Sequence, residues 1–73
     1  MEKKLKHIMS NIFDLNEDDI VSDSSMENIE KWDSLGHLKL IMAVEENFGV
    51  SLQADDMIDL TSFSKIKVFL EKI

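Results

Sequence analysis

The chain contains no proline and only two glycines, Gly36 and Gly49, among its 73 residues. Turn-rich β folds need these residue types at their turns, so their scarcity favours helices joined by few connections. A chain of this length forms one small domain, which buries only about 60% of the surface that its unfolded form exposes. We therefore predict a single all-α domain that covers residues 1–73 and contains no internal repeat.

Apolar residues near the N-terminus recur at the spacing of a helix with one buried face, i, i+3, i+4, i+7 and i+8. These residues are Leu5, Ile8, Met9, Ile12 and Phe13. The polar residues that fall mostly on the other, solvated side are Lys3, Lys4, Lys6, His7, Ser10 and Asn11. We expect this helix to end near Asp14.

Residues 34–48 form the second predicted helix, which is apolar on more than one side. Such a helix is either wrapped by neighbouring elements or offers part of its apolar surface to partners. Gly49 follows it, at the position where glycine commonly ends a helix. We expect the interior of the bundle to contain Leu38, Leu40, Val44, Phe48 and Ile58.

A long loop and two further helices complete the predicted bundle. Residues 14–33 lack clear periodicity, and loops of this length in small domains are usually functional or packed by their own side chains. The residues expected to anchor this loop are Ile20, Val21, Met26 and Ile29. Residues 55–59 form a short third helix, anchored by Met57, Ile58 and Leu60. Thr61 or Ser62 caps the last helix, which buries Phe63, Ile66, Leu70 and Ile73.

Charge is distributed unevenly along the chain. Residues 14–59 contain thirteen acidic residues and two lysines, a net charge of −11, whereas the flanking segments sum to +4. An acidic middle argues against nucleic acid as a partner, because phosphate backbones require a basic surface. It suits basic protein surfaces, although simple solvation explains many charge runs equally well.

Several other classes of protein are excluded by what the sequence lacks. There is no cysteine, so there is no disulfide, thiolate metal site or cysteine nucleophile. The longest apolar run, residues 40–44, is too short to span a membrane, and no apolar segment follows the N-terminal lysines as in a signal peptide. We therefore expect a cytoplasmic protein that is monomeric and has no membrane or nucleic-acid partner.

The start of the loop contains part of a calcium-binding pattern. Asp14, Asn16 and Asp18 match the first three ligand positions of a calcium-binding helix–loop–helix. The required glycine and the bidentate glutamate are replaced by Asp19 and Ser25. Without the sharp turn and the bidentate ligand, this interpretation fails.

The chemistry of the chain centres on Asp33 and Ser34, where the polar loop meets the second helix. An aspartate there typically caps the helix by accepting a free backbone N–H group. Ser34 would then occupy the first helical position, with its hydroxyl in water at the positive end of the helix dipole. A phosphate ester is favoured there by roughly 0.3–1 kcal/mol.

Ser34 does not resemble a hydrolase nucleophile. The two histidines are His7 and His37, and only His37, one helical turn away, could reach the serine. The chain has no Gly-x-Ser-x-Gly motif and no apparent oxyanion hole. We therefore predict that the protein is not an enzyme.

The segment Trp32-Asp33-Ser34-Leu35-Gly36-His37-Leu38, followed by residues 41–50, resembles the acyl carrier protein family. The resemblance covers the whole chain in length, helix spacing and acidity. It implies a four-helix bundle with a short third helix and a long loop between the first two helices. It also implies a 4′-phosphopantetheine arm on the Ser34 hydroxyl, which carries an acyl or aminoacyl group as a thioester.

The resemblance also implies partners and contact residues. Asp33 and Leu35 would be recognised by a phosphopantetheinyl transferase, and Leu35, Met42, Glu45 and Glu46 would contact partner enzymes. Those partners are an acyl- or aminoacyl-loading ligase and downstream acyl-transfer or synthase enzymes. Trp32 has two interpretations, a loop anchor packed against the bundle or a partner contact.

Two residues depart from the pattern of fatty-acid carriers and indicate a specialised, stand-alone type. Gly36 and Lys39 stand where such carriers often have acidic residues on the helix that basic enzyme surfaces contact. The cargo and the pathway are left open by the sequence. The alternative hypothesis is an unmodified acidic helical adaptor that binds protein partners through its second helix.

Overall fold

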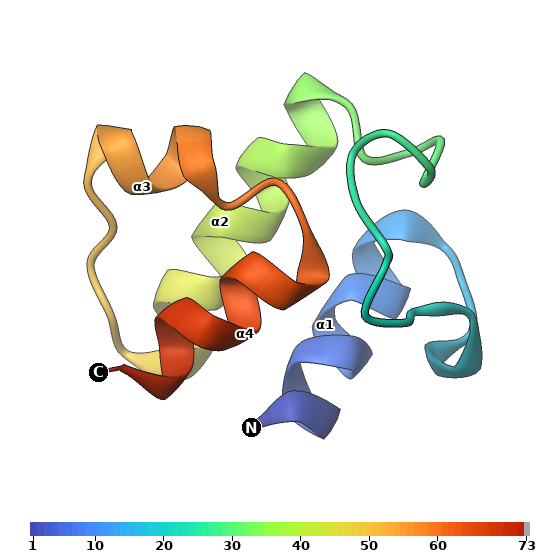
Figure 1. Cartoon of the computed structure of the whole chain (residues 1–73), viewed down its shortest axis with the longest axis horizontal. Coiled ribbons are helices and arrows are strands. Elements are labelled where there is room, and N and C mark those ends of the chain that lie inside the picture. Colours follow the sequence, from blue (N-terminus) through green and yellow to red (C-terminus); the bar gives the residue numbers. More distant parts are fainter. Residues whose placement is uncertain (73) are drawn as a thin grey trace.

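The computed structural model describes residues 1–72, and four α-helices and one 3-10 turn lie within this range (Figure 1). They are α1 (Glu2–Phe13), η1 (Glu17–Asp19), α2 (Ser34–Phe48), α3 (Ala54–Asp59) and α4 (Phe63–Glu71). The long segment between α1 and α2 and the six-residue α3 confirm the predicted all-α bundle. Ile73, which was expected to be buried in the last helix, lies outside the described residues.

The predicted helix ends are confirmed by their backbone geometry. The left-handed residue after α1 is Asp14 (φ 57°), and Gly49 (φ 64°) ends α2 in the same conformation. At the start of α2, Asp33 accepts a hydrogen bond from the backbone N–H of Gly36. At the start of α4, the Ser62 side chain accepts a hydrogen bond from the backbone N–H of Lys65. The helices α1, α2 and α4 therefore begin or end where a residue suited to the terminal geometry occurs in the sequence.

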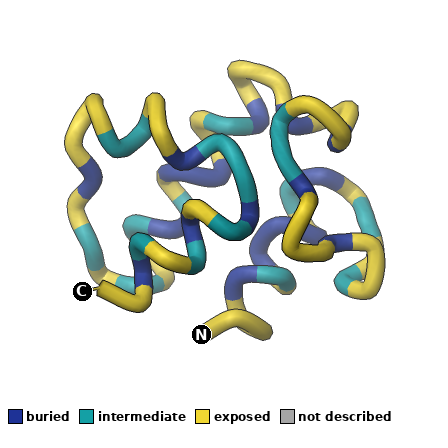
Figure 2. Tube along the Cα trace, viewed as in Figure 1, coloured by how far each residue is buried: buried dark blue, intermediate teal, exposed yellow. Residues whose placement is uncertain are grey.

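Side chains from α1, α2, α4 and the loop form one core. Figure 2 colours the trace by how far each residue is buried. The largest side chains that are nearly inaccessible to solvent are Trp32, Phe13, Phe63, Leu5, Met9, Ile20, Leu40, Ile41, Ile66 and Val44. Phe48 packs against this core and is partly buried. The expectations for Leu40, Val44 and the apolar face of α1 are thus confirmed, with Ile12 only partly buried.

The loop between α1 and α2 is attached to the bundle by apolar side chains and by backbone hydrogen bonds. Ile20 and Ile29 are buried and Met26 is partly buried, as predicted. The backbone N–H of Met26 donates to the carbonyl of Thr61, which precedes α4, over 3.1 Å. Val21 was expected to be an anchor, but 50% of its surface is exposed. Ile20 beside it is fully buried, and adjacent residues of an extended segment cannot both face the same core.

Three further predictions of burial are wrong. Leu38 and Ile58 were expected inside the bundle, yet they are 52% and 73% exposed. The reason is that α3 is a short helix with no buried residue, so it covers little of α2. Ser10 was placed on the solvated side of α1, but it is buried. Its hydroxyl donates a hydrogen bond to the His7 carbonyl over 2.7 Å, which removes the main cost of burying it.

Candidate functional site

Ser34 is the first residue of α2, and its side chain is exposed to solvent. The Asp33 carboxylate, not the serine hydroxyl, caps the helix by accepting the N–H of Gly36 over 2.8 Å. The His37 N–H donates to the Asp33 carbonyl, also over 2.8 Å. The serine hydroxyl therefore lies in water at the positive end of the fifteen-residue helix α2.

Gly36 allows the loop to pass close to the first turn of α2. It is buried, and a Cβ atom built on it would lie 2.2 Å from the Lys31 carbonyl oxygen and 3.2 Å from Phe13 Cε1. No other residue type fits this space without a backbone shift. From the resemblance to fatty-acid carriers, Gly36 was expected to replace an acidic residue on the surface of the helix. The structure shows instead that residue 36 lies inside the molecule and has no room for an acidic side chain.

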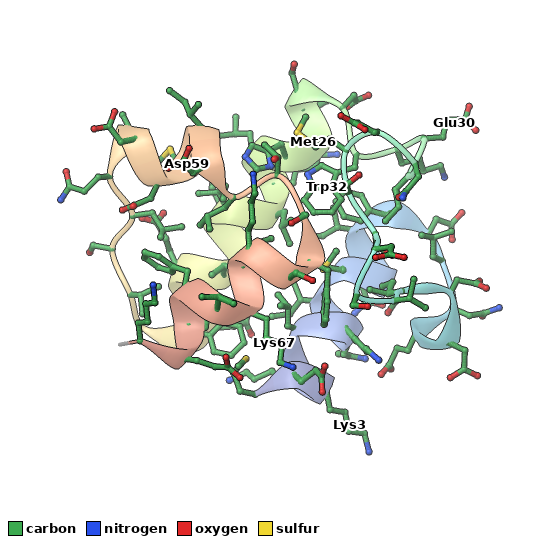
Figure 3. The ribbon with its side chains drawn as sticks, in the orientation of Figure 1. Lys3, Met26, Glu30, Trp32, Asp59 and Lys67 are labelled. Carbon is green, nitrogen blue, oxygen red and sulfur yellow. The ribbon has the colours of Figure 1, made fainter. Side chains whose placement is uncertain are left out.

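Trp32 anchors the end of the loop just before Asp33. Its side chain is 1% exposed and stacks on Phe13, with 5.1 Å between ring centroids. Figure 3 shows the Trp32 side chain inside the molecule, whereas Glu30 of the same loop points outward. The prediction of a loop anchor is therefore confirmed, and the alternative of a partner contact is excluded by burial. This packing fixes the residue two positions before Ser34.

His37 uses both ring nitrogens in hydrogen bonds away from Ser34. Its Nδ1 accepts from Trp32 Nε1 over 2.9 Å, and its Nε2 lies 2.6 Å from the carbonyl oxygen of Met57 in α3. The indole N–H can only donate and a carbonyl can only accept, so the ring is the neutral tautomer with its proton on Nε2. His37 is therefore unable to act as a general base for Ser34. The sequence did not predict this pairing.

Exposed apolar side chains lie beside Ser34. Leu35, Leu38 and Met42 are 61%, 52% and 59% exposed, and their spacing places them on one side of α2. Ile58 of α3 is 73% exposed. We call these four residues the apolar face. Several large apolar side chains exposed on a small domain commonly mark a binding site for another molecule.

The charged residues of α2 differ in what they contact. Glu46 is exposed, whereas Glu45 is half-buried and its Oε2 accepts a hydrogen bond from the Leu52 backbone over 2.9 Å. This bond ties the segment after α2 back onto the helix. Lys39 is exposed, and its side chain forms no ion pair with another residue in the range 1–72. A positive charge therefore lies on the same helix as the apolar face.

Two further observations limit the kinds of site present. No group of three or more histidine, aspartate or glutamate side chains within residues 1–72 is arranged to hold a metal ion. None of the helices described is long and apolar enough to cross a membrane. The site at Ser34 is thus an exposed hydroxyl next to the apolar face, and the one nearby histidine has both ring nitrogens engaged elsewhere.

The fold and this site define a small helical bundle that presents an exposed serine at the start of its second helix. The family model for the phosphopantetheine attachment site matches residues 3–69, and the chain belongs to this family. It is similar to an acyl carrier protein of Buchnera aphidicola subsp. Schizaphis graminum, with 34% identity over 89% of this chain and 82% of the relative. An acyl carrier protein of Buchnera aphidicola subsp. Baizongia pistaciae is 33% identical over 99% of this chain and 92% of the relative.

Membership of this family establishes three points that the sequence predicted. The protein is a carrier and not a catalyst. Its cofactor is phosphopantetheine, joined covalently to the protein. The partner that the family implies is a phosphopantetheinyl transferase, which attaches this group. The exposed Ser34 hydroxyl at a helix N-terminus fits a phosphodiester, because the helix dipole favours a negative charge there.

Proposed function

We propose that Ser34 is the residue that carries the 4′-phosphopantetheine arm. The observation that carries this proposal is the exposed position of its hydroxyl at the first residue of α2, with the capping role taken by Asp33. Because the cap does not depend on Ser34, modification of the hydroxyl leaves the helix start intact. The dipole of α2 contributes roughly 0.3–1 kcal/mol to holding the phosphate group there.

Attachment requires a base that the carrier does not provide. In the proposed reaction, Ser34 Oγ forms a bond to the phosphorus that bears pantetheine in coenzyme A. The bond to the nucleotide part breaks, and adenosine 3′,5′-bisphosphate leaves with the electron pair. Both nitrogens of His37 are already hydrogen-bonded, so the hydroxyl proton passes to a base on the transferase. Asp33 and Leu35 flank the hydroxyl, and we propose that the transferase recognises them.

The arm supplies the thiol on which cargo travels as a thioester, since the chain itself contains no cysteine. We propose that the cargo is an acyl or aminoacyl group, attached by a loading ligase and passed to downstream transfer or synthase enzymes. The contacts for these enzymes would be Leu35, Met42, Glu45 and Glu46. Exposure of Leu35 and Met42 supports this role, whereas half-buried Glu45 has one oxygen engaged by Leu52.

We further propose that this is a specialised carrier distinct from the general carriers of fatty-acid synthesis. The support comes from Lys39, an exposed cation on the helix where enzymes of this family are expected to contact acidic residues. Like charges across an interface lower the association rate and the affinity. A monomeric state and a cytoplasmic location remain predictions from the sequence.

The alternative function is an unmodified adaptor that binds partners through α2. The apolar face supports it as well, because exposure alone does not distinguish a carrier from an adaptor. The two hypotheses differ only in whether Ser34 becomes modified. Membership of a family that attaches phosphopantetheine argues against the unmodified adaptor.

The test is intact-mass measurement after incubation with coenzyme A and a phosphopantetheinyl transferase. The wild type should gain the mass of one arm, and Ser34→Ala should gain none while it keeps its circular dichroism spectrum. Ser51→Ala is the matched control, because Ser51 is also exposed and lies outside the helices. Modification of Ser34→Ala, or no modification of the wild type by a transferase active on another carrier, would refute the assignment.

A further inference from the structure

We infer that His37 is a positioning residue that holds α3 against α2 and thereby sets the place of Ile58 on the apolar face. The inference rests on the proposed function in one respect, namely that the transferase docks on this face to reach Ser34. Neither hydrogen bond of the His37 ring involves the serine.

The helix α3 is weakly attached to the rest of the bundle. It has six residues, none of them buried. Met57 packs only partly against the core, and its apolar neighbour Ile58 faces solvent. Within residues 1–72, the bond from His37 Nε2 to the Met57 carbonyl is the one side-chain hydrogen bond that joins α2 to α3. This bond also satisfies a carbonyl near the C-terminus of α3, where helical carbonyls lack partners.

His37 is itself held in place through its second ring nitrogen, Nδ1. Its Nδ1 accepts the Trp32 indole N–H, and the two rings lie nearly parallel at 6.2 Å between centroids. Trp32 is in turn buried against Phe13 of α1. A continuous series of contacts therefore runs from the core of α1 through Trp32 and His37 to Met57. Because His37 is held by the buried Trp32, its bond to Met57 fixes α3 relative to the core of the bundle.

The bond between His37 and Met57 also affects the apolar face on the surface of the bundle. Leu38 follows His37 in α2, and Ile58 follows Met57 in α3, so the hydrogen bond joins the residues next to these two exposed side chains. Leu35 and Met42 belong to α2 alone and keep their spacing whatever α3 does. Ile58 keeps its place relative to them only while α3 stays against α2. A partner that contacts all four residues therefore depends on His37 without touching it.

Two substitutions of His37 separate this role from general stability. The amide nitrogen of glutamine reaches about as far as Nε2, so His37→Gln keeps a donor for the Met57 carbonyl and gives up the acceptor for Trp32. The side chain of asparagine reaches only about as far as Nδ1, so His37→Asn keeps the acceptor and loses the bond to α3. We expect faster amide exchange in α3 for His37→Asn than for His37→Gln. The Trp32 indole proton resonance should move more in His37→Gln.

The functional measurement is the steady-state kinetics of modification by a phosphopantetheinyl transferase with coenzyme A. His37→Asn should raise KM for the carrier by about 2- to 10-fold, the range for loss of one hydrogen bond, with kcat unchanged. His37→Gln should stay within about 2-fold of the wild type. Ile58→Ala, which leaves the core untouched, should raise KM to a similar degree. Val68→Ala is the matched control, because Val68 is 47% exposed on α4, outside the apolar face.

The double variant His37→Asn with Ile58→Ala completes the test. If His37 acts through Ile58, the two effects on KM are not additive, because a displaced Ile58 has little left to lose. Additive effects, equal KM values for His37→Asn and His37→Gln, or an unchanged KM in Ile58→Ala would each overturn the inference. These outcomes leave the proposed function standing, because they require that the wild type is modified. Failure of the wild type to be modified refutes the proposed function instead.

Discussion

Replacing Gly36 by alanine should destabilise this protein, although the same change stabilises most helices. A glycine in a helix costs roughly 0.5–1 kcal/mol relative to alanine, so a helical Gly→Ala change is ordinarily favourable. At residue 36, however, the new Cβ atom would lie 2.2 Å from the Lys31 carbonyl oxygen and 3.2 Å from Phe13 Cε1. The first of these atoms belongs to the backbone and cannot rotate away.

The size of the effect follows from these contacts. Forcing an extra carbon into a packed site typically costs about 1–3 kcal/mol, and a contact with backbone places the cost in the upper part of that range. After subtraction of the helix gain, the net loss is about 1–2 kcal/mol. A domain of this size has a total stability of about 4–11 kcal/mol. The melting temperature should therefore fall by about 4–16 °C.

Thermal and urea unfolding measure the loss, and the fluorescence of Trp32 identifies its cause. Because Lys31 precedes Trp32, a displaced Lys31 carbonyl should disturb the buried indole in Gly36→Ala. Gly49→Ala is the matched control, since nothing lies within 4 Å of its Cβ position and its cost arises only from the left-handed backbone (φ 64°). That control should lose about 1 kcal/mol without a change in Trp32 emission. A Gly36→Ala protein as stable as the wild type would show that the loop does not pass as close as described.

Two further predictions concern the charged residues of α2. Glu45→Ala should lower the free energy of unfolding by about 1 kcal/mol through loss of the bond to the Leu52 N–H, whereas Glu46→Ala should stay within about 0.5 kcal/mol in the same urea titration. Lys39→Glu should increase turnover of the loaded carrier by a fatty-acid elongation enzyme, because it removes a positive charge from α2. Lys3→Glu on α1 is the control and should leave turnover unchanged. Equal turnover of the two variants would remove the argument for a specialised carrier.

The helices were predictable because their causes are local. The apolar spacing of α1, the caps Asp33 and Ser62, and the ending at Gly49 each act within a few residues of where they stand. The position of Ser34 followed from the same rules, because a capping aspartate places the next residue at the first helical position. Local sequence was thus sufficient to locate the candidate site.

Burial was harder to predict wherever it depended on what lies across from a residue. Leucine and isoleucine are usually found in protein cores, but the small size and weak attachment of α3 leave Leu38 and Ile58 exposed. Val21 was mistaken for an anchor because the direction of a side chain in an irregular loop has no sequence period to indicate it. Burial of Ser10 is tolerated because its hydroxyl bonds to the helix backbone, which periodicity does not reveal.

The sequence by itself determined the helix boundaries, the acidic middle, the absence of cysteine and the exposed serine at the start of α2, because these depend on composition and on short-range backbone geometry. The tertiary structure alone decided the roles of Gly36 and His37. Residue 36 must be glycine because the Lys31 carbonyl oxygen of the preceding loop leaves no space for a Cβ atom. His37 joins Trp32 to the Met57 carbonyl, twenty residues further along the chain. Contacts of this kind form only when separate elements pack together, so no pattern within either segment specifies them.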